Sequence, residues 1–404
     1  MDYFMPTAPS VPTYVKDFLL KDVFKHPKVN ESNMPYLDYI KDEFAKIDKE
    51  FTYLKYNIQA NTPYLLSSLS PNTLLLRVLG LQPVVKDICN TIIESLSLFF
   101  SSNPKAPYLV FGTTSYKKIE QCLDNNIHFI NNLFSIKLGP NETLLDGLYK
   151  MRNCSPKGRL FTAKEMFHIP FELRRLASTM RFSIPSIPAI YLANNLYICR
   201  DEIQADPSNG SVQGARFRLN DSIRVLNLAY NNRNISEYAS DRNTSQINDL
   251  IIAWLVLYPF ALASAVRKNN SQTINGVTPE YVLPQMLMEY VVNSPKAKLD
   301  GIRYLSTRII SNDSHINFYA CWAFPCKSDA KSGYDPNLCK KFLVTNGVRL
   351  PVRNNKKIDS SVFSGNIVNS NNRVPVNYRA SAETKVFADA ESRLWRQKPH
   401  KIIP

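Results

Sequence analysis

The sequence predicts an α+β protein in which an all-helical N-terminal unit precedes a mixed α/β domain. Three observations carry this prediction. The first 140 or so residues contain several stretches whose apolar residues recur every three or four positions. Beyond them, short strand-like stretches alternate with helical ones. The chain has 404 residues, of which 44% are hydrophobic and 21% charged, which is enough for a large core and more than one structural unit.

The N-terminal unit is assigned to residues 1–140. A helix is predicted over residues 34–57, where charges fill the positions between the apolar ones. The apolar positions are Leu37, Ile40, Phe44, Ile47, Phe51 and Leu54. Two further helices are predicted between residues 73 and 100, split near residues 80–83, and another over residues 116–134. This region has no metal set, Gly-rich phosphate loop or nucleophile motif, so we expect a lid, a partner-binding module or an oligomerisation element.

The second domain is assigned to residues 141–350. A strand with alternating polar residues is predicted around residues 149–152, and Thr162 with Glu165 forms a capping-box pattern that starts a helix. A further helix is predicted over residues 171–179. Two Ile-Pro pairs at residues 184–188 then predict an extended arm. We expect this arm to lead into a short strand at residues 189–192, followed by a turn and a helix that ends near Glu202.

The polar stretch at residues 204–247 predicts a loop with one short strand. Residues 250–266 carry no charge, contain Pro259 and are slightly short for a membrane span, so a buried core helix is favoured over a transmembrane one. A helix is predicted over residues 281–292. A turn at Asp300-Gly301 should feed a strand that ends at Ser306, and residues 316–324 predict another strand.

Residues 351–404 form a third region, a basic tail rich in Asn and Ser. Few apolar clusters occur in it, so we expect a largely irregular tail or strap that ends in a short amphipathic piece at residues 392–396.

The formal net charge of +15 favours an anionic partner, namely a nucleic acid, an acidic protein or a phosphorylated small molecule. A basic surface without a specific polyanion is the plain alternative. Seven Cys without a tight framework indicate reduced thiols and a cytoplasmic protein. The N-terminal residues lack the apolar region of a signal peptide. We therefore expect no membrane association.

Five residues form the candidate site: Arg152, Arg181, Tyr191, Glu202 and Ser306. NAD is an anion at its pyrophosphate and a cation at its nicotinamide. Arg offers planar bidentate donors to phosphate, and a Tyr ring can stack on the pyridinium or its ribose. A carboxylate stabilises the oxocarbenium ion that forms when the nicotinamide–ribose bond breaks. Spacing alone is a weak signal, since any basic protein has Arg, Tyr and Glu in number.

The order of these residues resembles the RES domain, which is named for its Arg, Glu and Ser. Residues 149–152 are similar to the family's opening Tyr/Arg strand. Arg181, Tyr191 and Glu202 match its Arg-x9-Tyr-x10-Glu core without a gap, and residues 301–306 match its late Gly-Ile-x-Tyr strand and Ser. The segment Met-Phe-His-Ile-Pro-Phe-Glu at residues 166–172 is similar to a subgroup. The resemblance covers about residues 145–325, and neither the N-terminal unit nor the tail.

The resemblance implies an ADP-ribosyltransferase-like fold with a mixed, split β-sheet. It also implies an NAD glycohydrolase or NAD phosphorylase that acts as a bacterial toxin by depleting NAD, with protein ADP-ribosylation as the alternative. In this mechanism Arg181 and Arg152 bind the pyrophosphate and Tyr191 positions the nicotinamide riboside. Glu202 stabilises the oxocarbenium ion, and Ser306 orients the substrate or the carboxylate. NAD is then a substrate, with no further cofactor or metal.

As partners, the resemblance implies a cognate antitoxin or immunity protein, and we expect an oligomer. We expect no nucleic acid partner, because no helix-turn-helix or aromatic single-strand platform is recognisable. A basic nucleic-acid-binding or scaffold protein without catalysis is the alternative from another class.

Two departures from the family concern the core. Thr179-Met-Arg-Phe-Ser183 stands where many members have Gly-Gly-Arg-Trp-Asn, so we expect a different loop around Arg181. Asp201 precedes Glu202, and only one of the two carboxylates should serve, because consecutive side chains diverge.

Two other groups rank lower. Cys321, Cys326, Cys339 and His315 lack the spacing of a common zinc site, so packing or free thiols are favoured. His168 lies among apolar residues, which favours a core histidine over a catalytic base.

Overall fold

The computed structural model divides the chain into two compact units. Unit 1 comprises residues 1–134 and 230–286, and unit 2 comprises residues 135–229 and 287–404. The structure describes residues 11–25, 28–30, 34–62, 64–70, 73–102, 114–130, 135–138, 147–154, 158–177, 179–203, 211–232, 235–236, 245–267, 277–308, 319–351 and 382–404. Residues 230–286 thus accompany the N-terminal helices, whereas the sequence-based division placed them in the 141–350 domain.

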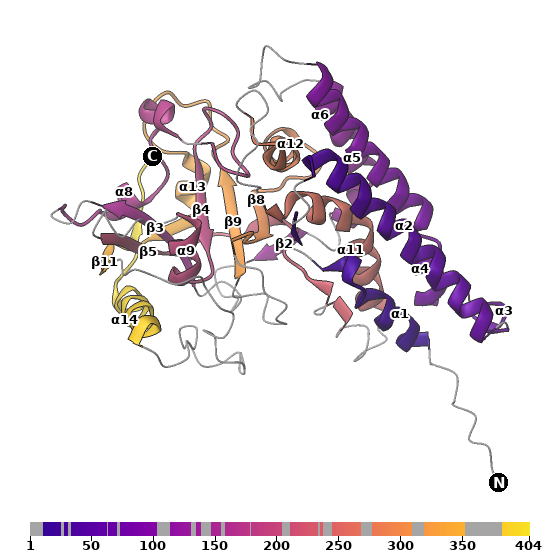
Figure 1. Cartoon of the computed structure of the whole chain (residues 1–404). Helices are drawn as coiled ribbons and strands as arrows, with labels where there is room; N and C mark the ends of the chain where they lie inside the picture. Colours follow the sequence, from indigo (N-terminus) through magenta and orange to yellow (C-terminus); the bar gives the residue numbers. More distant parts are fainter. Residues whose placement is uncertain are drawn as a thin grey trace, which may run out of the picture. The chain divides into compact units, whose positions relative to one another are not determined.

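Unit 1 is mainly helical (Figure 1). Its helices are α1 (Val11–Leu19), α2 (Tyr36–Asn61), α3 (Leu65–Ser68), α4 (Leu74–Leu79), α5 (Gln82–Ser102), α6 (Thr114–Asn125), α7 (Ile127–Phe129) and α11 (Ser245–Ser264), with a 3-10 turn η1 (Asp22–Phe24). Two short strands, β1 (Lys28–Val29) and β7 (Val266–Arg267), pair in parallel. The predicted helices at residues 34–57 and 84–100 correspond to α2 and α5, and the expected break lies between α4 and α5. Helix α12 (Pro279–Asn293) spans the residues at which the division between units falls.

Helix α11 is the core helix of unit 1. It is long and apolar enough to cross a membrane, but 78% of its apolar stretch Ile247–Ser264 is buried. The Tyr258 hydroxyl donates a hydrogen bond to the Val23 carbonyl at 2.9 Å, and the Trp254 and Phe24 rings lie 5.8 Å apart. Since α11 is apolar on all sides, it needs protein around its whole circumference. This explains why it joins the N-terminal helices.

Unit 2 is built on a ten-stranded mixed sheet within the described residues. Its order is β12-β10-β5-β3-β4-β9-β8-β6-β2, and β11 pairs with β5 beside β10. The strands are β2 (Ser135–Leu138), β3 (Leu148–Cys154), β4 (Ala189–Ala193), β5 (Ser211–Leu219), β6 (Ile223–Asn227), β8 (Gly301–Leu305), β9 (Ala320–Pro325), β10 (Phe342–Val344), β11 (Val348–Pro351) and β12 (His400–Lys401). Among the described strands of this sheet, only β6 and β8 pair in parallel. The α+β class and the mixed sheet are as predicted.

Helices cover both faces of this sheet (Figure 1). On one face, α8 (Ala163–Met166), the 3-10 helix η4 (Phe171–Leu176) and α13 (Pro336–Lys341) pack on an apolar cluster that includes Ile190, Leu192, Trp322 and Phe324. On the other face, α9 (Leu196–Glu202) and α14 (Ala382–Arg396) pack on a second cluster that includes Tyr149, Met151 and Cys321. We call these the α8 face and the α9 face.

The stretch at residues 204–247 differs from the prediction. It holds two strands, β5 and β6, and β5 is a central strand of nine residues. Three of its four polar side chains, Ser211, Gln213 and Arg216, are buried, so the strand is inside the protein although its sequence is polar. Gln213 is fully buried, donates to the Arg159 carbonyl at 2.9 Å and accepts from the Phe161 amide at 2.5 Å. Polarity therefore marks buried hydrogen bonds here, and not solvent exposure.

Two further expectations need correction. Residues 181–188 form two consecutive turns where we expected an extended arm: Ser183 N–H bonds to Met180 O at 3.1 Å and Ile187 N–H to Ile184 O at 3.1 Å. In the second turn Pro185 has the fixed φ that the position requires, and Ser186 takes a φ of 65°. The tail region includes the 15-residue helix α14, much longer than the expected piece at residues 392–396, while residues 352–381 lie outside the described residues.

Candidate functional site

Glu202 lies at the C-terminal end of α9, on the α9 face of the sheet. Asn195 begins this helix, and its Oδ1 accepts a hydrogen bond from the Ile198 amide at 2.8 Å. The Ser306 hydroxyl, just after β8, donates a hydrogen bond to Glu202 Oε1. Ser306 is fully buried and is fixed by its own amide, which bonds to the Tyr319 carbonyl at 2.9 Å. The structure thus joins two predicted site residues that are 104 positions apart in the chain.

A second neighbour of Glu202 is the Cys321 thiol on β9. Burial raises the pKa of Cys321 well above its usual value, and the charge of Glu202 and a hydrogen bond to it raise this pKa further. The thiol therefore stays protonated at neutral pH and can donate to the carboxylate. Ser306 and Cys321 are neutral donors, so they orient Glu202 without cancelling its charge.

Arg181 lies in the turns that precede strand β4, and Tyr191 lies on β4 itself. Arg181 is 8% exposed, and one guanidinium nitrogen donates to Thr307 Oγ1 at 3.2 Å, next to Ser306. The Tyr191 hydroxyl and Ser183 Oγ are 2.8 Å apart. Ser183 also accepts from the Met180 amide at 2.9 Å, so it ties the Arg181 turn to Tyr191.

Tyr304 is a buried neighbour of these groups. Its pKa is raised well above the usual value, first by burial, then by nearby acidic groups that include Glu202 and Tyr191, and the Arg181 charge works in the opposite direction. Its ring lies 4.4 Å from that of Phe182, centroid to centroid. Phe182 is the residue that replaces the indole expected beside Arg181, and it fills the space against β8.

The Asp201 and Glu202 side chains leave α9 in different directions, as expected for consecutive residues of a helix. The Asp201 carboxylate pairs with Arg200, whose Nε lies 3.1 Å from Oδ1. Burial raises the pKa of Asp201 to about 6, and the Arg200 charge offsets part of this rise. Glu202, and not Asp201, is the carboxylate that meets Ser306.

Arg152 lies apart from the other four residues, on the α8 face. Strand register explains this. Tyr149 on β3 is paired with Ala193 on β4, so Tyr149 and Met151 share the face of Tyr191, while Lys150 and Arg152 point to the other face. Arg152 donates to the Glu165 carbonyl, and its guanidinium stacks 4.7 Å from the Phe161 ring centroid.

Lys150 occupies the same face as Arg152. Its Nζ donates to the Phe167 carbonyl, and burial together with the Arg152 charge lowers its pKa to about 7. The opening strand therefore directs neither cation towards Glu202.

The lower-ranked groups have structural roles. His168 accepts from the Asp335 amide at Nε2, at 2.9 Å, and its Nδ1 lies 2.7 Å from the Ile169 carbonyl, so the ring is held as the neutral tautomer with the proton on Nδ1. Burial lowers its pKa to about 4. All seven cysteines are free and buried. Among the described residues no group of three or more His, Cys, Asp or Glu could hold a metal ion, and His315 lies outside them.

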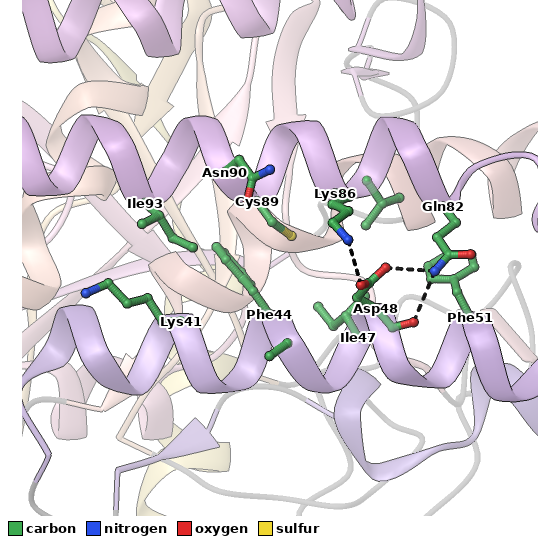
Figure 2. Close-up of a pocket in the computed structure, with 12 residues that line it drawn as sticks. Lys41, Phe44, Ile47, Asp48, Phe51, Gln82, Lys86, Cys89, Asn90 and Ile93 are labelled. Carbon is green, nitrogen blue, oxygen red and sulfur yellow. Dashed lines mark hydrogen bonds and ion pairs between the residues drawn. The ribbon is translucent and has the colours of Figure 1, made fainter.

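A pocket of about 230 Å³ lies in unit 1, between α2 and α5 (Figure 2). Phe44, Phe51 and Cys89 contribute apolar surface. Three of its polar groups bond to one another, because Asp48 accepts from Gln82 Nε2 at 2.7 Å and from Lys86 Nζ at 3.0 Å. None of the predicted site residues lines this pocket.

Sequence reasoning missed Ser183, Thr307, Tyr304 and Cys321. Thr307 follows the predicted Ser306 directly, so it could have been found by extending that strand. The pleat of β8 and β9 could have suggested that Tyr304 and Cys321 share one face, since they are directly paired. The bond between Ser183 and Tyr191 depends on the two turns, which the sequence did not indicate.

The sequence is similar to a Bacillus subtilis (strain 168) protein described as "Putative toxin YopC". The two are 28% identical over 263 residues, which covers 59% of this chain and 58% of that protein. The chain therefore spans less than two thirds of the relative's length. No protein-family model and no solved structure matches the sequence.

Proposed function

We propose that this chain is a toxin of RES type that consumes NAD by breaking the bond between nicotinamide and ribose. The observation that carries the proposal is the hydrogen bond between Ser306 and Glu202. Two residues singled out by their order in the sequence meet on one face of the sheet, with Arg181 held beside them through Thr307. The similarity to a protein described as a putative toxin supports the biological role.

Each side chain has a definite role in the proposed reaction. The Glu202 carboxylate faces the positive charge that develops on the ribose as nicotinamide leaves, and Ser306 and Cys321 hold its orientation. Arg181 binds the pyrophosphate through its guanidinium. The Tyr191 ring positions the nicotinamide riboside, and its hydroxyl is kept in place by Ser183. Nicotinamide leaves as a neutral molecule, so the reaction needs no general acid. Water or phosphate then bonds to the ribosyl carbon, and when water is the nucleophile its extra proton is released to the solvent.

The pyrophosphate site differs from the expectation. Arg152 is engaged with the Glu165 carbonyl and Phe161 on the α8 face, so the proposal assigns the phosphate contact to Arg181 alone. Substitution of Arg181 should therefore weaken NAD binding more than substitution of Arg152.

NAD turnover by wild type and Glu202→Gln tests the proposal. The purified protein should convert NAD to nicotinamide with ADP-ribose, or with its phosphate when inorganic phosphate is present, as separated by chromatography. E202Q keeps the shape and loses the charge, so we expect at least about a hundredfold lower kcat. Induced expression in bacteria should lower NAD and arrest growth with wild type and not with E202Q.

Asp201→Asn is the matched control, because it removes a carboxylate one residue away that faces Arg200. It should retain kcat within about threefold.

Labelled NAD incubated with a cell lysate separates hydrolysis or phosphorolysis, which release free ADP-ribose or its phosphate, from protein ADP-ribosylation, which labels protein. The proposal fails if wild type leaves NAD intact and labels no protein, or if E202Q is as active as wild type.

A further inference from the structure

Helix α9, which carries Glu202, is too short to be stable by itself. It has seven residues, and isolated helices shorter than about 12 residues are marginal in water. Its position must therefore come from tertiary contacts. The Ser306 hydrogen bond fixes only its C-terminal end, where Glu202 lies. What holds the opposite end decides where the carboxylate points.

The N-terminal end of α9 is held by Glu391 from helix α14. Glu391 is fully buried, and its Oε1 accepts a hydrogen bond from the Leu196 amide, the first residue of α9, at 2.9 Å. The Asn195 side chain bonds to Ile198, so two of the first amides of α9 have side-chain acceptors. A carboxylate at a helix N-terminus also interacts favourably with the helix dipole.

Helix α14 is itself anchored to the sheet, so it can serve as a fixed support. The Trp395 indole donates to the Tyr149 hydroxyl on β3 at 2.8 Å, and the Arg216 guanidinium of β5 lies 4.0 Å from the Trp395 ring centroid. The Phe387 and Leu394 side chains are part of the buried cluster of the α9 face. The two Trp395 contacts involve β3 and β5 and do not depend on α9.

Helix α14 also packs along the side of α9. The Tyr197 and Phe387 rings meet edge to face at 5.2 Å. The Arg200 guanidinium lies 4.4 Å from the Tyr197 ring and 5.2 Å from the Phe387 ring. Since Arg200 pairs with Asp201, this contact reaches the last turn of α9, next to Glu202.

We infer that Glu391 is a positioning residue for Glu202, and that α14 is part of the site although it contributes no residue to the proposed chemistry. The inference rests on the proposed function for the role of Glu202. Its physical basis is simple: with the first amide of α9 bonded to Glu391 and its last side chain bonded to Ser306, the helix is fixed at both ends. Loss of the N-terminal bond frees α9 to tilt and moves the carboxylate.

Two substitutions separate the acceptor at position 391 from its charge. Glu391→Gln keeps the length and the acceptor oxygen and removes the charge. Glu391→Asp keeps the charge and withdraws the acceptor by one methylene. We expect E391Q to retain kcat for NAD within about threefold, and E391D to lose at least about tenfold with KM changed less than about threefold, because the interaction acts on the transition state. Asp389→Asn removes an exposed carboxylate from the same helix and should leave kcat and KM unchanged.

Amide hydrogen exchange on the same full-length proteins supplies a readout that does not depend on activity. Amides of residues 196–199 should exchange at least about tenfold faster in E391D than in wild type and E391Q, while those of β3 and β5 keep their protection. The inference is overturned if E391D retains both protection and kcat, or if E391Q loses as much as E391D. If wild type does not consume NAD, the proposed function fails, and the exchange result alone decides whether Glu391 holds α9.

Discussion

Asp201 and Glu202 are adjacent carboxylates with different surroundings. Glu202 receives hydrogen bonds from neutral donors, whereas Asp201 is half-buried and pairs with Arg200. Both residues are carboxylates, so residue type does not distinguish them. The direction in which each side chain leaves α9 determines that Glu202, and not Asp201, contacts Ser306. Sequence order suggested Glu202, but only the geometry of α9 separates it from Asp201.

Asp201 makes a testable contribution to stability. Its pKa is about 6 in the folded protein against 3.8 ordinarily, so its contribution to folding is fully present below about pH 4 and is lost as the pH rises through about 6. Asp201→Asn removes this loss. The free energy of unfolding of D201N relative to wild type should therefore increase between pH 4 and pH 7, by up to about 3 kcal/mol.

Chemical denaturation of both proteins at pH 4 and pH 7 measures this difference directly. Taking the difference between the two proteins cancels the other titrating groups, such as Glu165, whose pKa is lowered to about 2 by Arg159. A difference that stays constant or falls over this range would contradict the assignment.

At the scale of elements, strands β8 and β9 form the base of the candidate site, and Gly301 sets their spacing. A Cβ at this position would lie 2.4 Å from the Ala323 carbonyl oxygen and 2.6 Å from a Phe324 ring carbon. Backbone cannot give way as a flexible side chain can, so only glycine lets β8 approach β9 at this point. Since β8 leads to Ser306, the spacing of these strands bears on the Glu202 contact.

Gly301→Ala should therefore lower the free energy of unfolding by about 1–3 kcal/mol, as measured by denaturant titration. The control is Gly80→Ala at the end of α4. There φ is −70° and the nearest atom to an added Cβ is 3.4 Å away, so the change should be neutral or slightly stabilising. Equal stabilities of G301A and wild type would show that the strands can separate without cost.

Periodicity predicted the helices in which the pattern of apolar residues along the sequence matches the residues that are buried. Helix α2 has an apolar stripe, α11 is apolar throughout, and the capping box of Thr162 and Glu165 is present in both directions. Strand β5 was not predicted because it contains buried polar residues such as Gln213, whose hydrogen-bond partners are distant in the chain. The side of the sheet on which Arg152 lies was not predicted either. It depends on how β3 pairs with β4 and β5, and the sequence of β3 alone does not encode this pairing.

At the scale of the whole molecule, the two units are interleaved in sequence. Unit 2 leaves off at Ala229 and resumes at Leu287, and the segment between them supplies α11 to unit 1. Within unit 1, α11 is bound by several N-terminal contacts: Tyr36 donates to the Ala263 carbonyl at 2.8 Å, and Arg77 pairs with Asp249 at 2.6 Å. The predicted boundary at residue 140 did not place α11 in the N-terminal unit, because the partners of α11 lie about 200 residues earlier in the chain.

Deletion of residues 1–134 should therefore not yield a soluble, folded unit 2. The remaining chain would keep α11 without α2, α4 and η1, and would expose its apolar surface. We expect the truncated protein to be mainly insoluble, as measured by the soluble fraction and size-exclusion chromatography after expression. The full chain is the control, and a soluble monodisperse truncation would contradict the interleaved arrangement.

The cap that Glu391 places on α9 also has a consequence for the timing of synthesis. Leu196 leaves the ribosome 195 residues before Glu391, and Glu202 leaves it 104 residues before Ser306. At about 5–20 residues per second, the first interval lasts about 10–40 s. Throughout that interval a nascent chain carries the carboxylate without the bond to Glu391, and until Ser306 has emerged it lacks the bond to Ser306 as well. A cell that makes this protein therefore translates most of the chain before the site can be complete.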